Sequence, residues 1–400
     1  MTAGPSRQRV DIAILGGGMA GAALAAHLAP GTRVALIERE PVLGYHTTGR
    51  SAAMFIPSYG GPAITGLTAA SRDFFLNPPP GFGPPLLTPR PVMHVAGPDQ
   101  IDRLDIFAAA HSVDRRSGAF EVLDGRAARV RVPILRSGAV AAALIEAGTG
   151  DLDVARLHAA LVRRVKQVGG VVLANAGAGA ITFDRSEWRV RGPDLDIAAP
   201  ILVNATGAWA DETAIAAGLG PLGLTPLRRT VMLARAPDLA GFAAWPVVKD
   251  IDERFYFRPS GGRLLITPAD ETPSAPCDAV ADEMDIALGM ARFEAAVDHP
   301  VAHLVGRWAG LRTFAPDRAP VVGWSTSRPG FFWLAGLGGF GIQTAPAMGR
   351  LAAALVEGRP VPSDLVDHGV QAQAYAPRRL EQAVASSSAA RRLSSEPQKA

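Results

Sequence analysis

The sequence predicts an α/β fold in which two domains are interleaved along the chain. Near the start, an apolar strand over 10–15 leads through a glycine-rich turn into a helix and a second strand over 34–37, which is the order of a βαβ unit. Similar apolar strands return at 171–173, 201–203 and 331–335. The segments between them hold strand-like pieces such as 254–257 and 263–266, which are typical of an antiparallel sheet. We therefore expect a parallel sheet that the chain leaves and re-enters, with an antiparallel α+β domain built from the interruptions.

The first βαβ unit has the residues of a dinucleotide-binding site. Gly16 permits a tight turn, Gly18 lets the backbone approach a pyrophosphate, and Gly21 lets the helix pack closely on the strand. Glu38 ends the second strand, where its carboxylate can accept hydrogen bonds from ribose hydroxyls. The alternative is a buried turn without a ligand, since the chain has 43 glycines. The strand before the turn, the helix after it and the acid at the end of the next strand favour a Rossmann-like unit.

Length and charge narrow the function classes. At 400 residues the chain is long enough for roughly two or three domains. The net charge is +3 and the arginines are scattered, so we expect no nucleic-acid partner. The longest apolar stretch, 12–29, contains a triple glycine and His27, so we expect strand, turn and helix there and no transmembrane segment. The first nine residues lack the apolar core of a signal peptide.

Cys277 is the single cysteine of the chain. One thiol excludes an intramolecular disulfide and a cysteine metal cluster, and we expect no metal site. A lone cysteine suits a reducing compartment. The expected location is the cytoplasm, with peripheral membrane association left open.

The predicted domain borders follow changes in composition. The segment 44–91 is dense in turn residues, including three consecutive prolines at 78–80, so we expect an ordered loop that serves a site rather than a continuous helix or a central strand. The predicted domains are a discontinuous cofactor domain over 8–91, 148–217 and 309–380, a substrate domain over 92–147 and 218–308, and a disordered tail over 381–400.

A second glycine-lined turn follows the strand over 331–335. Four glycines over 336–341 lead there into a helix expected over 342–357. Two such turns at one sheet suggest a long cofactor that is contacted at its pyrophosphate and at its far ring system. FAD fits this pattern better than NAD, so the first domain is predicted to be a Rossmann-like FAD-binding domain.

Five further segments carry a family resemblance: GYHTTGRSAA at 44–53, LTAASR at 67–72, NATGAW at 204–209, WAGLR at 308–312 and GGFGIQ at 338–343. In this order, and over essentially residues 8–380, the chain resembles the D-amino acid oxidase superfamily of FAD enzymes. Within that superfamily it is most similar to the bacterial D-arginine dehydrogenases.

The resemblance implies a set of FAD contacts. Residues 46–53 would run along the pyrophosphate and the flavin, and 338–344 would place backbone N–H groups near the flavin carbonyls, where they stabilise negative charge. For His46, a histidine satisfied by the backbone is the alternative. The implied cofactor-binding residues are Gly16, Gly18, Met19, Ala20, Gly21, Glu38, Arg39, His46, Thr47, Thr48, Ser51, Ala52, Ala53, Ala205, Gly207, Gly338, Gly339, Phe340, Gly341, Ile342, Gln343 and Thr344. The FAD is expected to be non-covalent.

The resemblance also implies a clamp for a substrate carboxylate, which a guanidinium fork holds well. Arg312 matches the carboxylate-binding arginine of the family, and Arg229 matches a second arginine. Tyr256 matches its tyrosine partner, and Tyr59 matches a pocket tyrosine on a mobile loop. These four are the predicted catalytic residues. The alternatives are surface ion pairs for the arginines and half-buried rings with hydrated hydroxyls for the tyrosines.

Two departures from the D-arginine dehydrogenases bear on the predicted substrate pocket, which also includes Gly339. Those enzymes carry a glutamate after an Arg-Pro pair, where this chain has Val92 after Arg90 and Pro91. They also carry a histidine five residues before the pocket tyrosine, where this chain has Met54. Both changes remove polar partners of a cationic side chain, so we expect a pocket for apolar or neutral side chains.

The leading hypothesis is an FAD-dependent D-amino acid dehydrogenase or oxidase, in which the Cα hydrogen leaves as hydride and the imine hydrolyses to a keto acid. Two others stay open. One is oxidation of an N-substituted or cyclic amino acid, as in sarcosine, glycine or proline oxidases, and the other is a flavin-binding redox protein without amine chemistry. The expected partners are a small amino acid or amine and an electron acceptor, either oxygen or a quinone.

Overall fold

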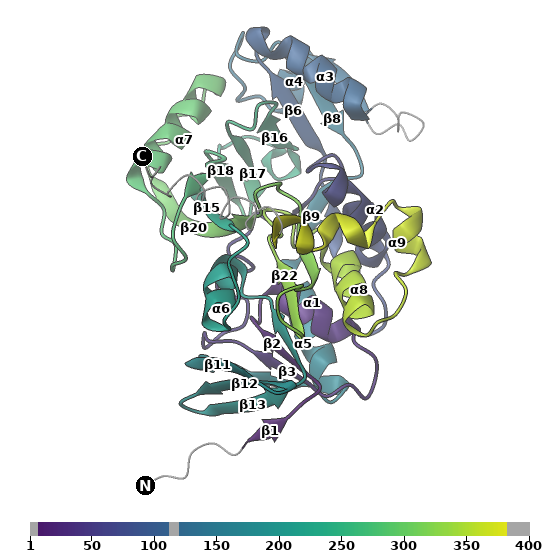
Figure 1. Ribbon diagram of the computed structural model, residues 1–400. Helices are drawn as coiled ribbons and strands as arrows, with labels where there is room; N and C mark the ends of the chain where they lie inside the picture. Colours follow the sequence, from purple (N-terminus) through teal and green to yellow (C-terminus); the bar gives the residue numbers. More distant parts are fainter. Residues whose placement is uncertain (1–6, 112–119, 382–400) are drawn as a thin grey trace, which may run out of the picture.

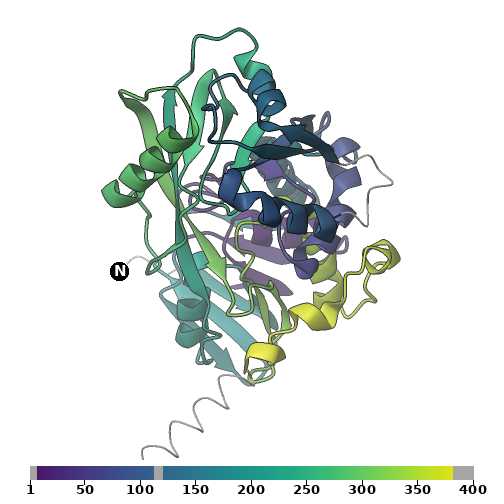
Figure 2. The same ribbon diagram turned by 90° about the horizontal axis from the view of Figure 1, so that it is seen from above.

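The computed structural model of the chain describes residues 7–111 and 120–381, and the strands in this part form four sheets. A six-stranded sheet lies in the lower half of Figure 1 and a nine-stranded sheet in the upper half. Seen from above in Figure 2, the helices at residues 101–111 (dark blue) and 283–296 (green) lie over different parts of the nine-stranded sheet. The chain passes between the two sheets several times.

The six-stranded sheet is assembled from distant segments. Its order is β10 (Val171–Leu173), β3 (Val34–Ile37), β2 (Ile12–Leu15), β14 (Ile201–Asn204), β22 (Phe331–Ala335) and β21 (Val321–Trp324). All neighbours pair in parallel except β21 and β22. The predicted α/β fold is confirmed.

Side-chain alternation along β2 gives this sheet two buried faces. Ile12 and Ile14 pack against the helices, whereas Ala13 and Leu15 pack against a four-stranded sheet on the other side. The helices on the first face are α1 (Met19–His27), α5 (Val154–Gln167) and α8 (Ala345–Val356). The four-stranded sheet has the order β1 (Gln8–Arg9), β13 (Leu195–Ala199), β12 (Glu187–Gly192) and β11 (Ala180–Asp184). With both faces covered, the strand ends are the part of the sheet that a ligand can reach.

The nine-stranded sheet comes from the segments between these strands. Its order is β19 (Thr272–Pro273), β15 (Thr225–Arg235), β18 (Arg263–Thr267), β17 (Tyr256–Ser260), β16 (Val247–Asp250), β6 (Val92–Ala96), β8 (Ala142–Glu146) and β7 (Phe120–Asp124), with β20 (Leu304–Phe314) paired to β15. One parallel pair, β16 with β6, interrupts the antiparallel order. These two strands come from separate excursions of the chain, so no hairpin imposes an antiparallel pairing on them.

Alternation also gives the nine-stranded sheet two different faces. Val248 and Phe257 point into a core covered by α4 (Gly125–Arg131) and α7 (Glu283–Ala296). Val247 and Tyr256, on the opposite face of the same strands, pack against residues 52–59 of the loop that follows β3. This second face is therefore turned toward the six-stranded sheet.

The turn-rich segment 44–91 contains a helix that the sequence analysis did not expect, α2 (Pro62–Leu76). Pro62 stands in the first turn, where a proline fits a helix. A Cβ on Gly66 would lie 2.6 Å from the carbonyl oxygen of His368, so this glycine serves close packing rather than a turn. The same segment supplies two strands of a three-stranded sheet ordered β4 (Met54–Phe55), β9 (Gly150–Leu152) and β5 (Leu87–Pro89).

Two predicted borders differ from the observed elements. The border between residues 308 and 309 falls inside β20. Helix α8 begins at Ala345 rather than at 342, because 338–344 forms consecutive turns. The two discontinuous domains stay a proposal, which the division of the strands between the two large sheets supports. The remaining short helices are α3 (Ile101–His111), α6 (Ala210–Ala216), α9 (Ser363–Asp367) and the 3-10 turns Pro98–Gln100, Gly207–Trp209, Phe242–Ala244 and Ala372–Tyr375.

Of the predicted disordered tail, only Glu381 belongs to the described residues. Its carboxylate accepts hydrogen bonds from the Ser325 hydroxyl and from the Thr326 amide, and the rest of that prediction lies outside the described residues. Among the helices of the described part, none is both long and apolar enough to cross a membrane.

Candidate active site

The parallel strands of the six-stranded sheet open at their carboxyl ends into a cavity of about 390 Å³. Gly16, Glu38 and Ala205, each directly after a strand, line one part of it. Tyr256 and Arg312 line its other end, where it meets the nine-stranded sheet. This is the position at which open α/β sheets bind ligands.

The glycine turn after β2 makes the close contacts that its sequence indicates. Gly16 has a φ of +105°, and a Cβ there would lie 2.3 Å from the carbonyl oxygen of Ala205. A Cβ on Gly21 would lie 2.1 Å from the carbonyl oxygen of Gly16. At Gly18 the nearest protein atom would be the Thr48 hydroxyl at 3.4 Å, which is an ordinary contact. No protein contact requires a glycine at 18, and the close approach of a ligand is the remaining reason for one.

Backbone N–H groups of this turn line the same cavity. The Gly17 amide donates to Glu38 Oε2 at 2.9 Å, which fixes the carboxylate beside the turn. Within the described residues, the amides of Gly18 and Ala20 donate to no protein acceptor, and both residues line the cavity. Free N–H groups at the start of a nine-residue helix can bind a phosphate group.

The turn over 336–344 brings a second set of N–H groups to the other end. The amides of Gly339, Gly341 and Ile342 have no acceptor among the described residues, and all three residues line the cavity. A Cβ on Gly339 would lie 2.7 Å from the Arg312 guanidinium. Glycine therefore lets this turn lie directly on the arginine.

Arg312, on β20, is a cation without an ion pair among the described residues. Its Nη1 donates to the Tyr59 hydroxyl at 3.0 Å. Burial raises the pKa of the Tyr59 phenol, but the charges of Arg312, Arg229 and Lys249 together outweigh burial, so this pKa lies below its usual value of 10. A guanidinium with free N–H groups in a partly closed cavity can bind a carboxylate.

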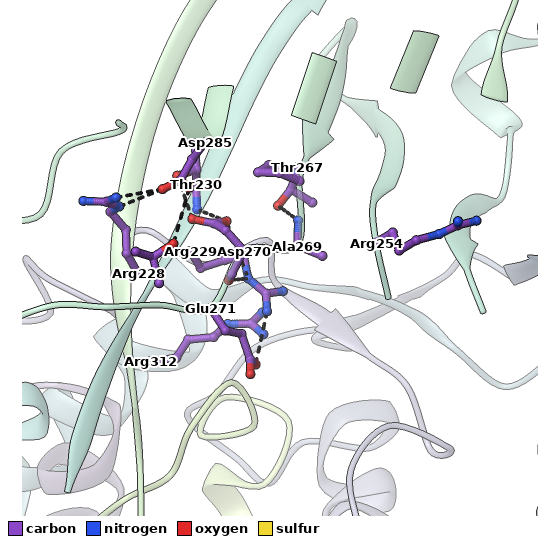
Figure 3. Close-up of polar contacts among 12 residues, drawn as sticks. Arg228, Arg229, Thr230, Arg254, Thr267, Ala269, Asp270, Glu271, Asp285 and Arg312 are labelled. Carbon is purple, nitrogen blue, oxygen red and sulfur yellow. Dashed lines mark hydrogen bonds and ion pairs between the residues drawn. The ribbon is translucent and has the colours of Figure 1, made fainter. Parts of the chain in front are cut away.

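Arg229 lies nearby on β15 and is already held by the protein (Figure 3). Its Nε donates to the carbonyl oxygen of Asp270 at 2.7 Å, and its Nη2 lies 3.4 Å from Glu271. Burial and the charge of Arg312 lower the pKa of the Arg229 guanidinium. The Asp270 carboxylate is bound in turn by the amide and the hydroxyl of Thr230. Arg229 is thus a fixed cation in the lining of the cavity.

A smaller cavity of about 50 Å³ continues beyond Arg312. Its lining consists of Ser51, Ala52, Ala53, Met54, Ile56, Tyr59, Arg229, Val247, Lys249, Glu253, Tyr256, Ala269, Arg312, Gly339, Ile342 and Gln343. The structure therefore brings the four residues predicted as catalytic, together with Met54 and Gly339, around one small space.

Two charged residues of this lining, Lys249 and Glu253, are absent from the sequence-based site. Lys249 Nζ lies 2.6 Å from Glu253 Oε1 and 4.8 Å from the centre of the Tyr59 ring. Along β16, Val248 points into the core, whereas Val247 and Lys249 point to the cavity. The signal in the sequence is a lysine two residues after Val247, on the same side of the strand.

The predicted cofactor contacts divide between the two cavities. The larger cavity is lined by Gly16, Gly18, Met19, Ala20, Glu38, Arg39, His46, Thr47, Thr48, Ser51, Ala52, Ala205, Gly207, Gly338, Gly339, Gly341 and Ile342. Ala53 and Gln343 line the smaller one. His46 bonds to Glu40 at 2.9 Å, and its ring lies 4.6 Å from that of Trp209, a lining residue that was not predicted.

Four predicted site residues line neither cavity: Gly21, Val92, Phe340 and Thr344. Gly21 packs on the turn before it, the Phe340 ring packs against aromatic neighbours, and the Thr344 hydroxyl donates to the Phe340 carbonyl oxygen. Val92 is fully buried behind the cavity wall, among side chains of β16 and β17. Because Val92 lines neither cavity, it does not support the predicted preference for an apolar or neutral side chain.

A family model described as FAD dependent oxidoreductase, the DAO family, matches residues 11–355. The chain belongs to this family. Its cofactor is therefore FAD, and the larger cavity suits that molecule. Free N–H groups and a carboxylate lie at one end, as pyrophosphate and ribose require, and a second row of free N–H groups lies at the other, as a ring system with carbonyls requires.

Several known proteins are similar over most of the chain. A glycine oxidase from Geobacillus kaustophilus is 26% identical over 384 residues, which cover 89% of this chain and 95% of the relative. A 4-methylaminobutanoate oxidase (formaldehyde-forming) from Paenarthrobacter nicotinovorans is 25% identical over 401 residues, covering 89% of this chain and 45% of the relative. The chain thus spans less than half the length of this second relative.

Solved structures share the fold. An L-proline dehydrogenase from P. horikoshii superposes with a TM-score of 0.80 at 20% identity, over 94% of this chain and 99% of that one. A glycine oxidase from Geobacillus kaustophilus superposes with a TM-score of 0.76 at 27% identity, over 88% and 95%. None of these relatives is a D-arginine dehydrogenase, so the predicted resemblance is confirmed for the family and not for that subgroup.

Proposed function

We propose that the protein oxidises glycine or a secondary amino acid, meaning one whose nitrogen carries a second carbon substituent or belongs to a ring. The observation that carries this proposal is Arg312, a guanidinium without an ion pair among the described residues, at the junction of the two cavities. The printed activities of the relatives, on glycine, 4-methylaminobutanoate and L-proline, support the same substrate class.

In this proposal the larger cavity holds the cofactor. Gly16, Gly18 and the start of α1 hold the pyrophosphate, Glu38 holds a ribose, and residues 338–342 contact the ring system. Bound FAD supplies the acceptor for the hydrogen and the two electrons that leave the carbon next to the amine nitrogen.

The protein residues bind and orient the substrate. Arg312 takes the carboxylate with its guanidinium fork, Arg229 adds a second positive charge, and Tyr256 and Tyr59 supply hydroxyls. The cations around the smaller cavity lower the pKa of a bound substrate ammonium, because like charges disfavour its charged form. The amine is then uncharged, its N–H proton leaves to water, and the imine is hydrolysed to a carbonyl compound and an amine or ammonia.

Oxidation of a D-amino acid with an apolar or neutral side chain is the second candidate. It rests on Met54, Val247 and Ala269, which give the smaller cavity an apolar wall. A cationic side chain is disfavoured there, because the Lys249 ammonium lines the same space.

Anaerobic bleaching of the flavin tests the proposal. We expect glycine, sarcosine or L-proline to bleach the holoenzyme at least about tenfold more efficiently than D-leucine or D-arginine, a difference of ~1.4 kcal/mol in transition-state binding. Faster bleaching by D-leucine would favour the second candidate instead. Bleaching by NAD(P)H and by no amino acid would contradict both and indicate a redox protein without amine chemistry.

Oxygen and a quinone are the two proposed electron acceptors, and hydrogen peroxide formation in air distinguishes them. The cytoplasm is the proposed location, on the basis of the lone cysteine.

A further inference from the structure

We propose that Lys249 forms a second anion-binding subsite, so that the preferred substrate carries a second carboxylate, on its nitrogen or on its side chain. The proposal rests on the proposed function, because the first carboxylate is assigned to Arg312. It names the substrate class for the same site.

The position of Lys249 relative to Arg312 is the first argument. Tyr59 lies between the two cations: its hydroxyl accepts from Arg312 Nη1 at 3.0 Å, and its ring centre lies 4.8 Å from Lys249 Nζ. Both cations therefore contact the same tyrosine, one at its hydroxyl and one at its ring, and both line the smaller cavity. A short dicarboxylate in this cavity can present one carboxylate to each of them.

The partner of Lys249 is the second argument. Glu253 lies in the hairpin turn between β16 and β17, in a left-handed conformation with φ of +56°. Its side chain is 44% exposed, whereas that of Lys249 is 12% exposed. Among the described residues the Glu253 carboxylate has no hydrogen bond besides the one from Lys249, so a ligand carboxylate can take its place on the less exposed ammonium.

The field at Glu253 is consistent with this exchange. Burial raises the pKa of its carboxyl, but the charges of Lys249, Arg229 and Arg312 outweigh burial and keep this pKa below the usual value. The Glu253 carboxylate thus contacts Lys249 and lies in the combined field of all three cations. A ligand carboxylate at the Lys249 ammonium would gain from the same field.

The other two cations of the smaller cavity, Arg229 and Arg312, already have a protein partner or an assigned ligand group. Arg229 is held by the carbonyl oxygen of Asp270 and by Glu271, and Arg312 is assigned to the first carboxylate. Lys249 remains as the cation whose protein partner is displaceable. Its second contact, with the Tyr59 ring, leaves donors of the ammonium free.

The alternative explanation is that Lys249 has a purely structural role. In that case the ammonium only steadies the Tyr59 ring, and replacing it weakens all carboxylate ligands by the same factor. The ratio of the affinities for a dicarboxylate and a monocarboxylate distinguishes the two roles of Lys249. An effect on Tyr59 changes both affinities by the same factor and leaves their ratio unchanged.

The binding test uses the purified holoenzyme titrated with succinate and with acetate, followed by the flavin absorbance. We expect succinate to bind wild type at least about tenfold more tightly than acetate, Lys249→Met to reduce this ratio about tenfold, and Glu253→Gln to increase it several-fold. Lys166→Met, an exposed lysine on α5, is the matched control and should keep the wild-type ratio. Equal affinities in wild type, or an unchanged ratio in Lys249→Met, would overturn the subsite.

A reduction test separates this inference from the proposed function. Sarcosine and iminodiacetate, which differ by one carboxylate on the N-substituent, are compared by anaerobic flavin reduction. The subsite predicts a preference for iminodiacetate that falls about tenfold in Lys249→Met. Reduction by sarcosine with no such preference would overturn the subsite alone. If none of glycine, sarcosine, L-proline and iminodiacetate reduced the flavin, the proposed function would fail, and the binding ratio would still decide the subsite.

Discussion

Tyr59 lies in the loop after β3 and contacts two cations of the smaller cavity, Arg312 and Lys249. The preceding residue, Ser58, donates from its amide and its hydroxyl to Glu146, at 3.0 and 2.6 Å. His94 Nε2 lies 2.9 Å from the same carboxylate, and all three side chains are buried. A buried carboxylate with several hydrogen bonds is held in one position. The turn that carries Tyr59 is therefore anchored to β6 and β8.

The lowered pKa of Tyr59 leads to a pH prediction for ligand binding. A phenolate next to Arg312 would neutralise the guanidinium and compete with a ligand carboxylate. We therefore expect the affinity for acetate to fall as the pH rises through the Tyr59 pKa, with the fall beginning below pH 10. Titrations of the flavin absorbance with acetate, repeated across alkaline pH, measure this.

Two tyrosine variants complete that experiment. Tyr59→Phe should lose the alkaline fall, whereas Tyr375→Phe should keep it, because the Tyr375 hydroxyl donates to Ala63 and Tyr375 lines neither cavity. An alkaline fall of wild-type size in Tyr59→Phe would show that another group titrates.

At the scale of elements, the glycine turn before α1 contains two kinds of glycine. At Gly16 the positive φ and the 2.3 Å approach to Ala205 make any side chain incompatible with the fold. At Gly18 the backbone is ordinary and a methyl group has room beside Thr48. The first glycine thus serves the protein, and the second serves the ligand.

This difference predicts separable effects of two alanine variants. Gly18→Ala should fold with nearly wild-type stability as the apoprotein but bind FAD about 5- to 150-fold more weakly, since an added methyl against a ligand costs about 1–3 kcal/mol. Gly16→Ala should lower the melting temperature of the apoprotein itself. Tight FAD binding by Gly18→Ala would contradict the assignment of the pyrophosphate to this turn.

How much of the site could be predicted depends on how local its signal is. The strand, glycine turn and Glu38 lie within one short segment, so their pattern indicates a dinucleotide site directly. Arg229 and Arg312 came from the family resemblance, and the structure brings them to one cavity. The sequence alone does not assign Lys249 to the site, because only the pairing of β16 in the nine-stranded sheet shows which side of the strand faces the cavity.

The errors have the same origin. Helix α2 was missed because Pro62 and Gly66 resemble turn residues until their helix position and packing are known. Val92 was assigned to the pocket by its place in the chain, and it lies on the same face as Val247 and Tyr256, but neighbouring side chains cover it completely. The face on which a side chain lies and the neighbours it packs against depend on the assembled sheet, so they cannot be read from a single sequence.

At the scale of the whole molecule, interleaving places the carboxyl ends of one sheet against one face of the other. Two excursions of the chain, one between β3 and β10 and one between β14 and β21, add strands to the nine-stranded sheet and then return to the six-stranded one. The cofactor cavity and the cationic cavity are built at this junction, so neither sheet alone contains the site.

Buried histidines predict how the stability of the whole molecule depends on pH. Burial lowers the pKa of His27, His94 and His158 below the usual 6.5. Below pH 6.5 the unfolded chain binds protons that the folded chain does not, so the free energy of unfolding is expected to fall as the pH decreases from 7 to 5. Urea denaturation at these pH values measures it.

A variant at one histidine tests this account. His27→Gln keeps a donor for the Ala23 carbonyl oxygen and removes one titrating group, so it should reduce the fall. His303→Gln, at an exposed position, is the control and should leave the fall as it is in wild type. An unchanged pH dependence in His27→Gln would contradict the role of buried histidines.

The central claim is that Arg312 holds the substrate carboxylate so that the amine lies next to FAD. Its most direct test is the anaerobic flavin reduction rate, with the amino acid that bleaches wild type fastest, in Arg312→Met and in Arg228→Met. Arg228 is the matched control, since it pairs with Asp285 on α7 (Figure 3). We predict that Arg312→Met retains FAD and loses at least about 30-fold in reduction efficiency, the loss of ~2 kcal/mol or more expected for a buried charge partner. Arg228→Met should stay within about threefold of wild type, since Arg228 lines neither cavity. Reduction of Arg312→Met as efficient as that of Arg228→Met would contradict the claim.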